Sequence, residues 1–196
     1  MTCGWSTLWR SSSLPSRRRI EGTKEGAVPA DELAHSLRRL HGTLGKTQTK
    51  LPTFRRAVRR AREALDNDAF MAALAPCDRD FLRVIIDEGV AMLDELSVEE
   101  QRLHGEPHDA NRLVTANGLR WVDFESCCVG PVEWDLAFQP PEVIEHFRDT
   151  DTELLTLLRR LNSARVATWC WGRARSPDMR RHGEMHLASL RRAMGA

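Results

Sequence analysis

The segment QRLHGEPHDANRLVTANGLRWVDFESCCVGPVEWDLA, residues 101–137, places His, Glu, Asn and Asp side chains in short loops beside an expected β-hairpin. Two strand-like runs, Arg112–Thr115 and Leu119–Phe124, are separated by Asn117-Gly118, which is a strong short-range hairpin signal. The loop HGEPHDAN enters the hairpin and the residues DFE leave it. Because a hairpin returns the chain to where it left, we expect the polar side chains of the two loops to lie close together.

Helical periodicity dominates the chain on both sides of this segment. A first helix is expected to begin near Pro29 and to stop at His41-Gly42. Further helices are expected at residues 54–65, 78–96, 132–138, 140–149, 152–173 and 178–194. The predicted fold class is therefore mainly α, with one β-hairpin that carries the polar loops.

Composition is ordinary for a soluble globular protein, with 41% hydrophobic and 29% charged residues in 196. A net charge of +1 provides no bulk field for nucleic acid or an anionic membrane, and we expect neither as a partner. No apolar run approaches the ~18 residues that span a bilayer. The five Cys are odd in number and include the adjacent pair Cys127-Cys128, which we expect to be an ordinary buried or half-buried pair. This Cys usage indicates a reducing compartment and a cytoplasmic location.

Three side chains of the central segment suit phosphoryl transfer. Asn111 ends the first loop and Asp123 follows the hairpin. An Asn oxygen beside a carboxylate, completed by water and phosphate oxygens, suits Mg²⁺. Glu106, in the same loop as Asn111, could accept a proton from a substrate hydroxyl. Together they form the minimum for metal-assisted phosphoryl transfer, in which positioning and charge neutralisation contribute most of the catalysis.

The same residues resemble a known family in three consecutive motifs. Residues 104–111, HGEPHDAN, resemble the H-G-D-x-H-x-x-N catalytic loop of aminoglycoside phosphotransferases and related choline and homoserine kinases. Residues 123–125, DFE, resemble the metal-binding D-F-E of that family, and residues 130–137, GPVEWDLA, resemble its G-x-x-x-x-D-L-A element. The resemblance implies the helical C-terminal lobe of a protein-kinase-like fold over residues 29–175, with residues 176–196 as a last amphipathic helix of that lobe.

The resemblance also implies a role for each matching residue. Glu106 stands at the position of the catalytic Asp of the family, and Asn111 and Asp123 stand at the positions that hold Mg²⁺. The residues expected to brace the loops are His104, His108 and Asp135. Glu125 is either a solvated acid or a second acid near the metal. The implied cofactors are Mg²⁺ and ATP, and the implied partner is a small molecule with a hydroxyl acceptor; the oligomeric state stays open.

Two departures from the family pattern bear on activity. Glu106 carries its carboxylate one methylene further out than Asp, and a displacement of about 1 Å can lower a rate about a hundredfold. Residues 1–28 show no sustained periodicity and no strand around Lys24, so they are expected to be a disordered or unrelated extension. We therefore expect the N-terminal nucleotide-binding lobe to be absent, as in a truncated gene, and activity to be weakened or lost. The alternative is an inactive fragment or a helical binding module.

A zinc enzyme is a remote alternative. The sequence His104-Gly105-Glu106 fits the H-x-E of zinc deaminases, whose other ligands come from a later P-C-x-x-C. Only Cys127-Cys128 follows here, and adjacent thiolates do not reproduce that spacing. A zinc site from His104, His108 and a Cys, in a hydrolase or deaminase, has no recognised arrangement.

Overall fold

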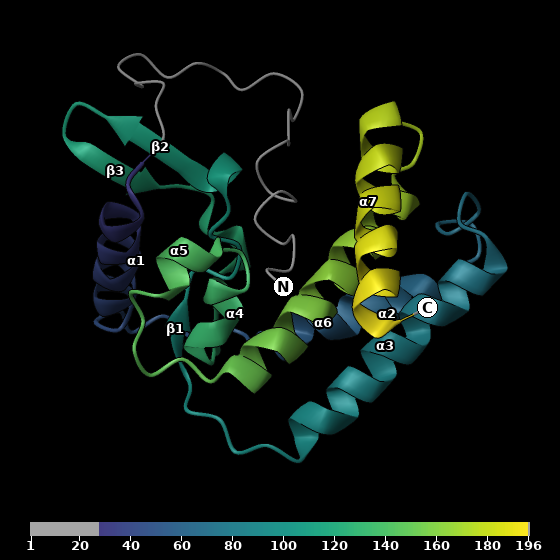
Figure 1. Ribbon diagram of the computed structural model, residues 1–196, viewed down its shortest axis with the longest axis horizontal. Coiled ribbons are helices and arrows are strands. Elements are labelled where there is room, and N and C mark those ends of the chain that lie inside the picture. The colour runs from purple at the N-terminus through teal and green to yellow at the C-terminus, as the bar shows by residue number, and fades with distance from the viewer. Residues whose placement is uncertain (1–27, 196) are drawn as a thin grey trace. The chain divides into compact units, whose positions relative to one another are not determined.

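The computed structural model describes residues 28–195, which form two compact units. Residues 28–53 and 99–152 make up the first unit, and residues 54–98 and 153–195 make up the second (Figure 1). Among residues 28–195, helices hold 59% of the residues and strands 9%, so the predicted mainly α fold is confirmed. The extension predicted for residues 1–28 lies outside the described residues, except for Val28.

The first unit combines one long helix with short strands and helical turns. Its elements are α1 (Ala30–Leu44), β1 (Gln101–Leu103), η2 (Asp109–Asn111), β2 (Arg112–Thr115), β3 (Gly118–Trp121), η3 (Phe124–Ser126), β4 (Cys128–Gly130), α4 (Val132–Leu136) and α5 (Pro141–Ile144). β1 pairs antiparallel with β4, and Leu103 lies opposite Cys128. The loop after β1 and the η3 segment before β4 therefore leave the same end of this small sheet.

The predicted hairpin is confirmed, but its turn lies one residue earlier than expected. Thr115 pairs with Gly118 across β2 and β3, so the exposed turn residues are Ala116 and Asn117. Gly118 has a φ of 90°, a conformation that glycine adopts without strain. The Thr115 hydroxyl accepts a hydrogen bond from the Asn117 amide at 3.2 Å and donates one to the Gly118 carbonyl at 2.8 Å. These local bonds select the observed turn.

The end predicted for the first helix, at His41-Gly42, is wrong, because α1 continues to Leu44. Glycine inside a helix costs only about 1 kcal/mol relative to Ala, which tertiary contacts can outweigh. One such contact comes from His41, which is buried and hydrogen-bonded to another part of the unit.

The second unit contains the four other α-helices of the described residues. They are α2 (Arg55–Leu65), α3 (Pro76–Asp94), α6 (Thr152–Gly172) and α7 (Pro177–Met194). Their core includes Leu82 and Ile86 of α3 with Leu158 and Leu161 of α6, all with no exposed surface. The helices expected at residues 78–96 and 152–173 are thus present within about two residues of their predicted ends.

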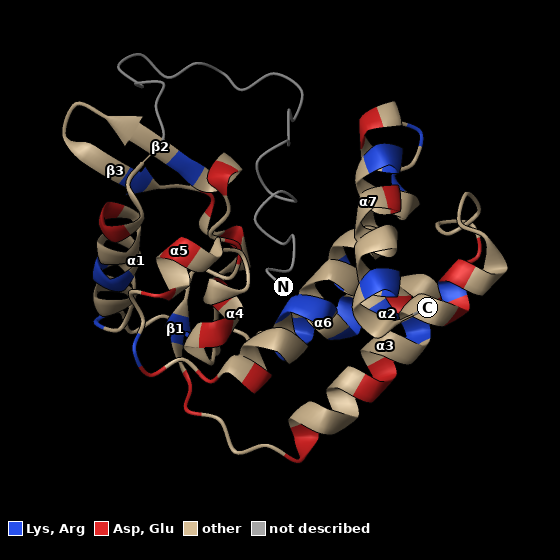
Figure 2. Ribbon diagram, in the orientation of Figure 1, with Lys and Arg blue, Asp and Glu red and all other residues tan. Residues whose placement is uncertain are grey.

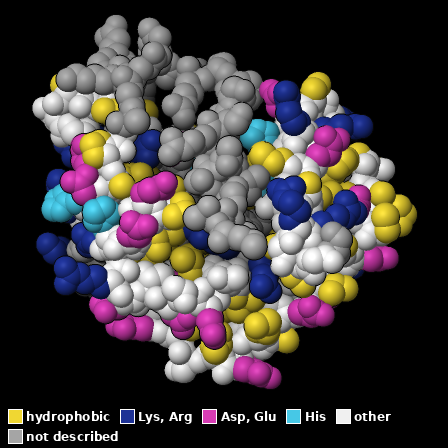
Figure 3. Space-filling model, viewed as in Figure 1, with side chains coloured by type: hydrophobic (Ala, Val, Ile, Leu, Met, Phe, Trp, Pro, Cys, Tyr) yellow, Lys and Arg dark blue, Asp and Glu magenta, His cyan; other side chains and the backbone are white. Residues whose placement is uncertain are grey.

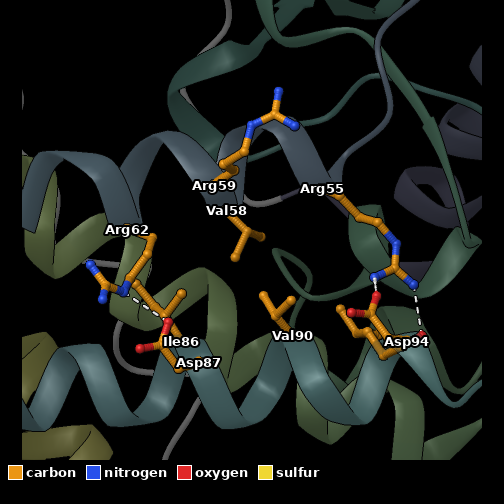
Figure 4. Close-up of a pocket in the computed structure, with 9 residues that line it drawn as sticks. Arg55, Val58, Arg59, Arg62, Ile86, Asp87, Val90 and Asp94 are labelled. Atoms are coloured by element: carbon orange, nitrogen blue, oxygen red, sulfur yellow. Dashed lines mark hydrogen bonds and ion pairs between the residues drawn. The ribbon is translucent and has the colours of Figure 1, made fainter.

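A pocket of about 320 Å³ opens between α2 and α3 (Figure 4). Aliphatic side chains from both helices face each other across it, and an ion pair lies near each end: Arg55–Asp94 at 2.6 Å and Arg62–Asp87 at 2.8 Å. None of the residues predicted for the functional site lines this pocket.

The surface mixes charges of both signs. Acidic and basic residues share α1, α3 and α7 (Figure 2). On the face shown in Figure 3, hydrophobic side chains form small patches between charged ones. No helix within residues 28–195 combines the length and apolar character needed to cross a bilayer.

α6 and α7 share a buried polar contact. Ser163 Oγ and His186 Nδ1 lie 2.7 Å apart in a hydrogen bond, and both residues are buried. Burial, with smaller contributions from the charges of His182 and Arg165, lowers the pKa of His186 to about 4. The imidazole is therefore neutral in the folded protein near pH 7.

Lowering the pH from about 6.5 to about 4 is expected to destabilise the protein by up to about 3 kcal/mol through His186. In this window the unfolded chain binds a proton at His186 that the folded chain does not, so this contribution to stability is complete above pH 6.5 and is lost as the pH falls. The measurement is the free energy of unfolding in urea at a series of pH values. His186→Gln should remove this part of the pH dependence, whereas His182→Gln should retain most of it. An unchanged pH dependence in His186→Gln would contradict the prediction.

Candidate active site

A fully buried carboxylate, Asp135 of α4, anchors the loop that follows β1. Its Oδ2 accepts hydrogen bonds from the His104 amide at 2.9 Å and from His41 Nε2 at 2.7 Å. Its Oδ1 accepts a hydrogen bond from the Gly105 amide at 2.8 Å. Asp135 has no exposed surface, so these bonds offset the desolvation of its charge. The carboxylate thereby fixes the backbone where the loop begins.

The backbone of Gly105 lies close against Ser126 of η3. Its φ is 88°, and a Cβ at this position would lie 2.0 Å from the Ser126 carbonyl oxygen. The Gly105 carbonyl also accepts a hydrogen bond from Trp134 Nε1 at 3.1 Å. Hydrogen bonds therefore hold both the amide and the carbonyl of residue 105, and the space beside its Cα admits only glycine.

Gly105→Ala is expected to destabilise the protein by about 3 kcal/mol, because left-handed strain adds to the overlap with Ser126. Urea unfolding measures the loss. Gly118→Ala is the matched control, since Gly118 has a similar φ of 90° but a Cβ there would meet nothing within 4 Å. The control should lose about 1 kcal/mol, from strain alone. Equal losses in both variants would show that the close approach to Ser126 contributes nothing.

The ring of His104 links the two polar loops. Nε2 donates to the Val122 carbonyl at 3.0 Å, and Nδ1 accepts from the Glu106 amide at 3.3 Å. The ring also lies 5.1 Å from the ring of Phe124 and 5.9 Å from that of Trp121, measured between centroids. Both ring nitrogens are engaged within the unit, so His104 offers no nitrogen to a zinc ion.

Residues 106–111 form a compact turn held by its own backbone. The Glu106 carbonyl accepts hydrogen bonds from the His108 amide at 2.8 Å and from Asn111 Nδ2 at 3.0 Å. His108 Nδ1 accepts one from the Ala110 amide at 3.2 Å. Gln139, three residues after the end of α4, donates a hydrogen bond from Nε2 to the Pro107 carbonyl. The side chain of Asn111 is thus fixed through its nitrogen.

Asp123 takes an unusual backbone conformation beside Asn111. Among residues 28–195 it is the one non-glycine residue with a positive φ, of 64°. The preceding residue is held on both sides, because the Val122 amide donates to the Asn111 carbonyl at 3.0 Å and its carbonyl accepts from His104. Left-handed conformations of non-glycine residues are strained and cluster at functional sites. The structure therefore brings Asp123 next to the loop, as the hairpin predicted.

Asn111 and Asp123 fit the ligand chemistry of Mg²⁺. The Asn111 amide is anchored through Nδ2, and its Oδ1 accepts no hydrogen bond from the described residues. The Asp123 carboxylate is exposed and likewise has no partner within residues 28–195. Amide and carboxylate oxygens are hard ligands, and Mg²⁺ retains several water or phosphate oxygens. In the described part of the chain no group of three His, Cys, Asp or Glu residues could hold a metal ion. The hard ligands that this site offers are the oxygens of Asn111 and Asp123.

The two remaining predicted acids occupy different environments. Glu106 is half-buried within the anchored turn, directly after Gly105. Glu125 is exposed in η3, two residues after Asp123. Cys127 and Cys128 are buried, as predicted, and burial followed by the negative charge of Asp135 raises the pKa of the Cys127 thiol. This thiol is therefore held in its protonated, unreactive form.

Sequence reasoning missed three residues that hold this site: His41, Trp134 and Gln139. Of these, His41 had a usable signal, because it follows Leu33 and Leu37 at four-residue spacing on the apolar face of α1. Trp134 and Gln139 act on backbone carbonyls of the loop from 29 and 32 residues away, and no local pattern announces such contacts.

A protein-family model described as the phosphotransferase enzyme family matches residues 20–175. No curated protein matches the chain.

Two solved structures share the fold. The choline kinase LicA from Streptococcus pneumoniae is 14% identical, with a TM-score of 0.63; the match covers 83% of this chain and 63% of that chain. LicA in complex with AMP is also 14% identical, with a TM-score of 0.62 and coverage of 82% and 61%. The chain thus spans less than two thirds of the length of these structures.

Proposed function

Because the chain belongs to the phosphotransferase enzyme family, we propose that it catalyses transfer of the γ-phosphoryl group of ATP to a hydroxyl group of a small molecule. The proposal includes the assignment of residues 29–175, with the helix that follows, to the helical C-terminal lobe of the kinase-like fold. One observation carries it: Asp135 and His104 hold the loop of residues 104–111 beside Asp123, so that the three polar groups predicted for phosphoryl transfer belong to one anchored cluster.

Each residue of the cluster has a role in this proposal. Glu106 orients the acceptor hydroxyl and accepts its proton. Asn111 and Asp123 hold Mg²⁺, which when bound neutralises charge on the phosphate oxygens. Asp135 and His104 position the loop.

Two further predicted residues, His108 and Glu125, have supporting roles. His108 orders the turn through the Ala110 amide and its contact of 3.4 Å with Asn111 Nδ2. Glu125, exposed beyond Asp123, is the second acid near the metal.

The two substrates are supported to different degrees. The fold shared with a choline kinase that was also solved with AMP supports a nucleotide as the phosphoryl donor. That neighbour makes choline the first acceptor to test, followed by aminoglycosides, homoserine and sugars.

A second candidate function is a helical module that binds the acceptor without transferring a phosphoryl group. One observation favours it: Glu106 stands where the family resemblance expects Asp. The two candidates differ in their dependence on nucleotide, because only the enzyme must bind Mg·ATP.

The test uses the full 196-residue chain. Calorimetry measures the binding of Mg·ATP, and an ADP-release assay measures ATP turnover with each acceptor in turn. If the chain is a phosphotransferase, ATP binding should depend on Mg²⁺, and ADP release should require one of the acceptors. Acceptor binding without any ATP binding supports the second candidate, and the absence of both contradicts the two proposals.

A further inference from the structure

We propose that His41 of α1 is a positioning residue for the catalytic loop and acts through Asp135. The effect of His41 on the loop is independent of the proposed function, whereas its effect on turnover rests on that function. Nothing in the motif comparison assigns a role to His41, which lies outside all three motifs.

His41 is the third hydrogen-bond donor to the Asp135 carboxylate, after the His104 and Gly105 amides. Its Nε2 lies 2.7 Å from Asp135 Oδ2, the same oxygen that accepts the His104 amide at 2.9 Å. Because a carboxylate only accepts, Nε2 must carry the proton. His41 is 7% exposed and Asp135 is not exposed at all, so water does not readily replace this bond.

The bond fixes the orientation of the carboxylate plane. The two backbone donors, His104 and Gly105, contact different oxygens of Asp135 and both belong to the loop that must be positioned. His41 comes from a separate element, 94 residues away in sequence. Because His41 lies outside the loop, its hydrogen bond can hold the Asp135 carboxylate in place when the loop backbone moves.

α1 also contacts the end of β3, the strand that leads to the other polar loop. Trp121 Nε1, at the end of β3, donates to Ser36 Oγ at 3.0 Å. Asp123 follows Trp121 by two residues. α1 therefore supports the start of the catalytic loop through His41 and the approach to Asp123 through Ser36, and it can keep the two in register.

A histidine on an apolar helix face can instead be a simple core residue whose hydrogen bond is satisfied. That role predicts a general loss of stability on substitution, spread over the whole unit. Positioning predicts a local loosening of the His104 and Gly105 amides beyond any general loss, together with rescue by a side chain that restores the donor.

The experiment compares three variants of the full chain by NMR hydrogen exchange. His41→Leu removes the donor, His41→Gln replaces Nε2 with an amide nitrogen at a similar reach, and His35→Leu is the surface control on the exposed side of the same helix. In His41→Leu, the His104 and Gly105 amides should exchange at least about tenfold faster than in the wild type, when each rate is divided by that of the Leu37 amide of α1. His41→Gln and His35→Leu should stay close to the wild type. If His41→Leu does not fold, His41→Asn, whose amide is too short to reach Oδ2, replaces it.

Unchanged relative exchange of the His104 and Gly105 amides in the variant without the donor overturns the proposal, as does failure of His41→Gln to restore protection. Turnover provides the second readout: kcat should fall about tenfold in His41→Leu, with KM for ATP nearly unchanged, and His41→Gln should restore it. If the wild-type chain shows no turnover, the proposed function fails, and hydrogen exchange alone still decides the role of His41.

Discussion

Asp123→Asn is expected to lower Mg²⁺-dependent phosphoryl transfer by at least about a hundredfold, with little change in the free energy of unfolding. The substitution removes the negative charge that would face Mg²⁺ and keeps the size of the side chain. Asn tolerates the left-handed conformation of residue 123 about as well as Asp does. The Asp123 carboxylate is exposed and has no partner within residues 28–195, so the fold loses no contact there.

The assay is the initial rate of ADP release over a range of Mg²⁺ concentrations, with urea unfolding run on the same preparations. Glu142→Gln is the matched control, because it removes an exposed carboxylate of α5, outside the proposed site. Turnover of Asp123→Asn at the wild-type rate would refute the metal assignment. An equal loss in Glu142→Gln would show that the effect is one of general charge and does not belong to Asp123.

Glu106→Asp is expected to raise turnover by roughly ten- to a hundredfold, since shortening the side chain by one methylene restores the carboxylate position that the family resemblance implies. The backbone at residue 106 is well held, because its amide donates to His104 Nδ1 and its carbonyl accepts from Asn111 and His108. A fixed backbone cannot shift to compensate for the extra methylene, so side-chain length should translate directly into carboxylate position.

Glu106→Gln completes this comparison by removing the charge at constant length. It should lower kcat well below the wild-type value, while Mg·ATP affinity by calorimetry stays similar in both variants. A kcat that is unchanged in Glu106→Asp and lowered in Glu106→Gln would mean that Glu106 already places its carboxylate correctly. A kcat that is unchanged in both variants would remove Glu106 from the chemistry.

The parts of the site that could be predicted from sequence are those encoded by short-range patterns. Two strand-like runs with a turn between them place Asn111 and Asp123 together, because hairpin pairing is a local property of about ten residues. The observed turn lies one residue earlier than the sequence predicts, because the hydrogen bonds of Thr115 favour Ala116-Asn117 as the turn residues, with glycine directly after them. A difference of that size depends on side-chain hydrogen bonds that dipeptide statistics do not contain.

The supporting contacts could not be predicted, because they join residues far apart in the chain. His41 and Asp135 come together through tertiary packing. Gly42, the residue after His41, predicts a helix end that the structure does not have. Gly105 carried no local sign that Ser126 would approach it, since this contact depends on the pairing of β1 with β4. In each case the missing information is the three-dimensional neighbour, which residue type and periodicity do not specify.

The division of the chain into two units has a consequence for synthesis on the ribosome. Each unit is built from two separate stretches, 28–53 with 99–152 and 54–98 with 153–195, so the chain passes from one unit to the other three times. When α2 and α3 leave the exit tunnel, Leu161 of α6, whose side chain lies against Gly89 of α3, has not yet been made. Neither unit can complete its core until its second stretch is translated, so the nascent chain carries uncovered apolar helix faces for much of its synthesis.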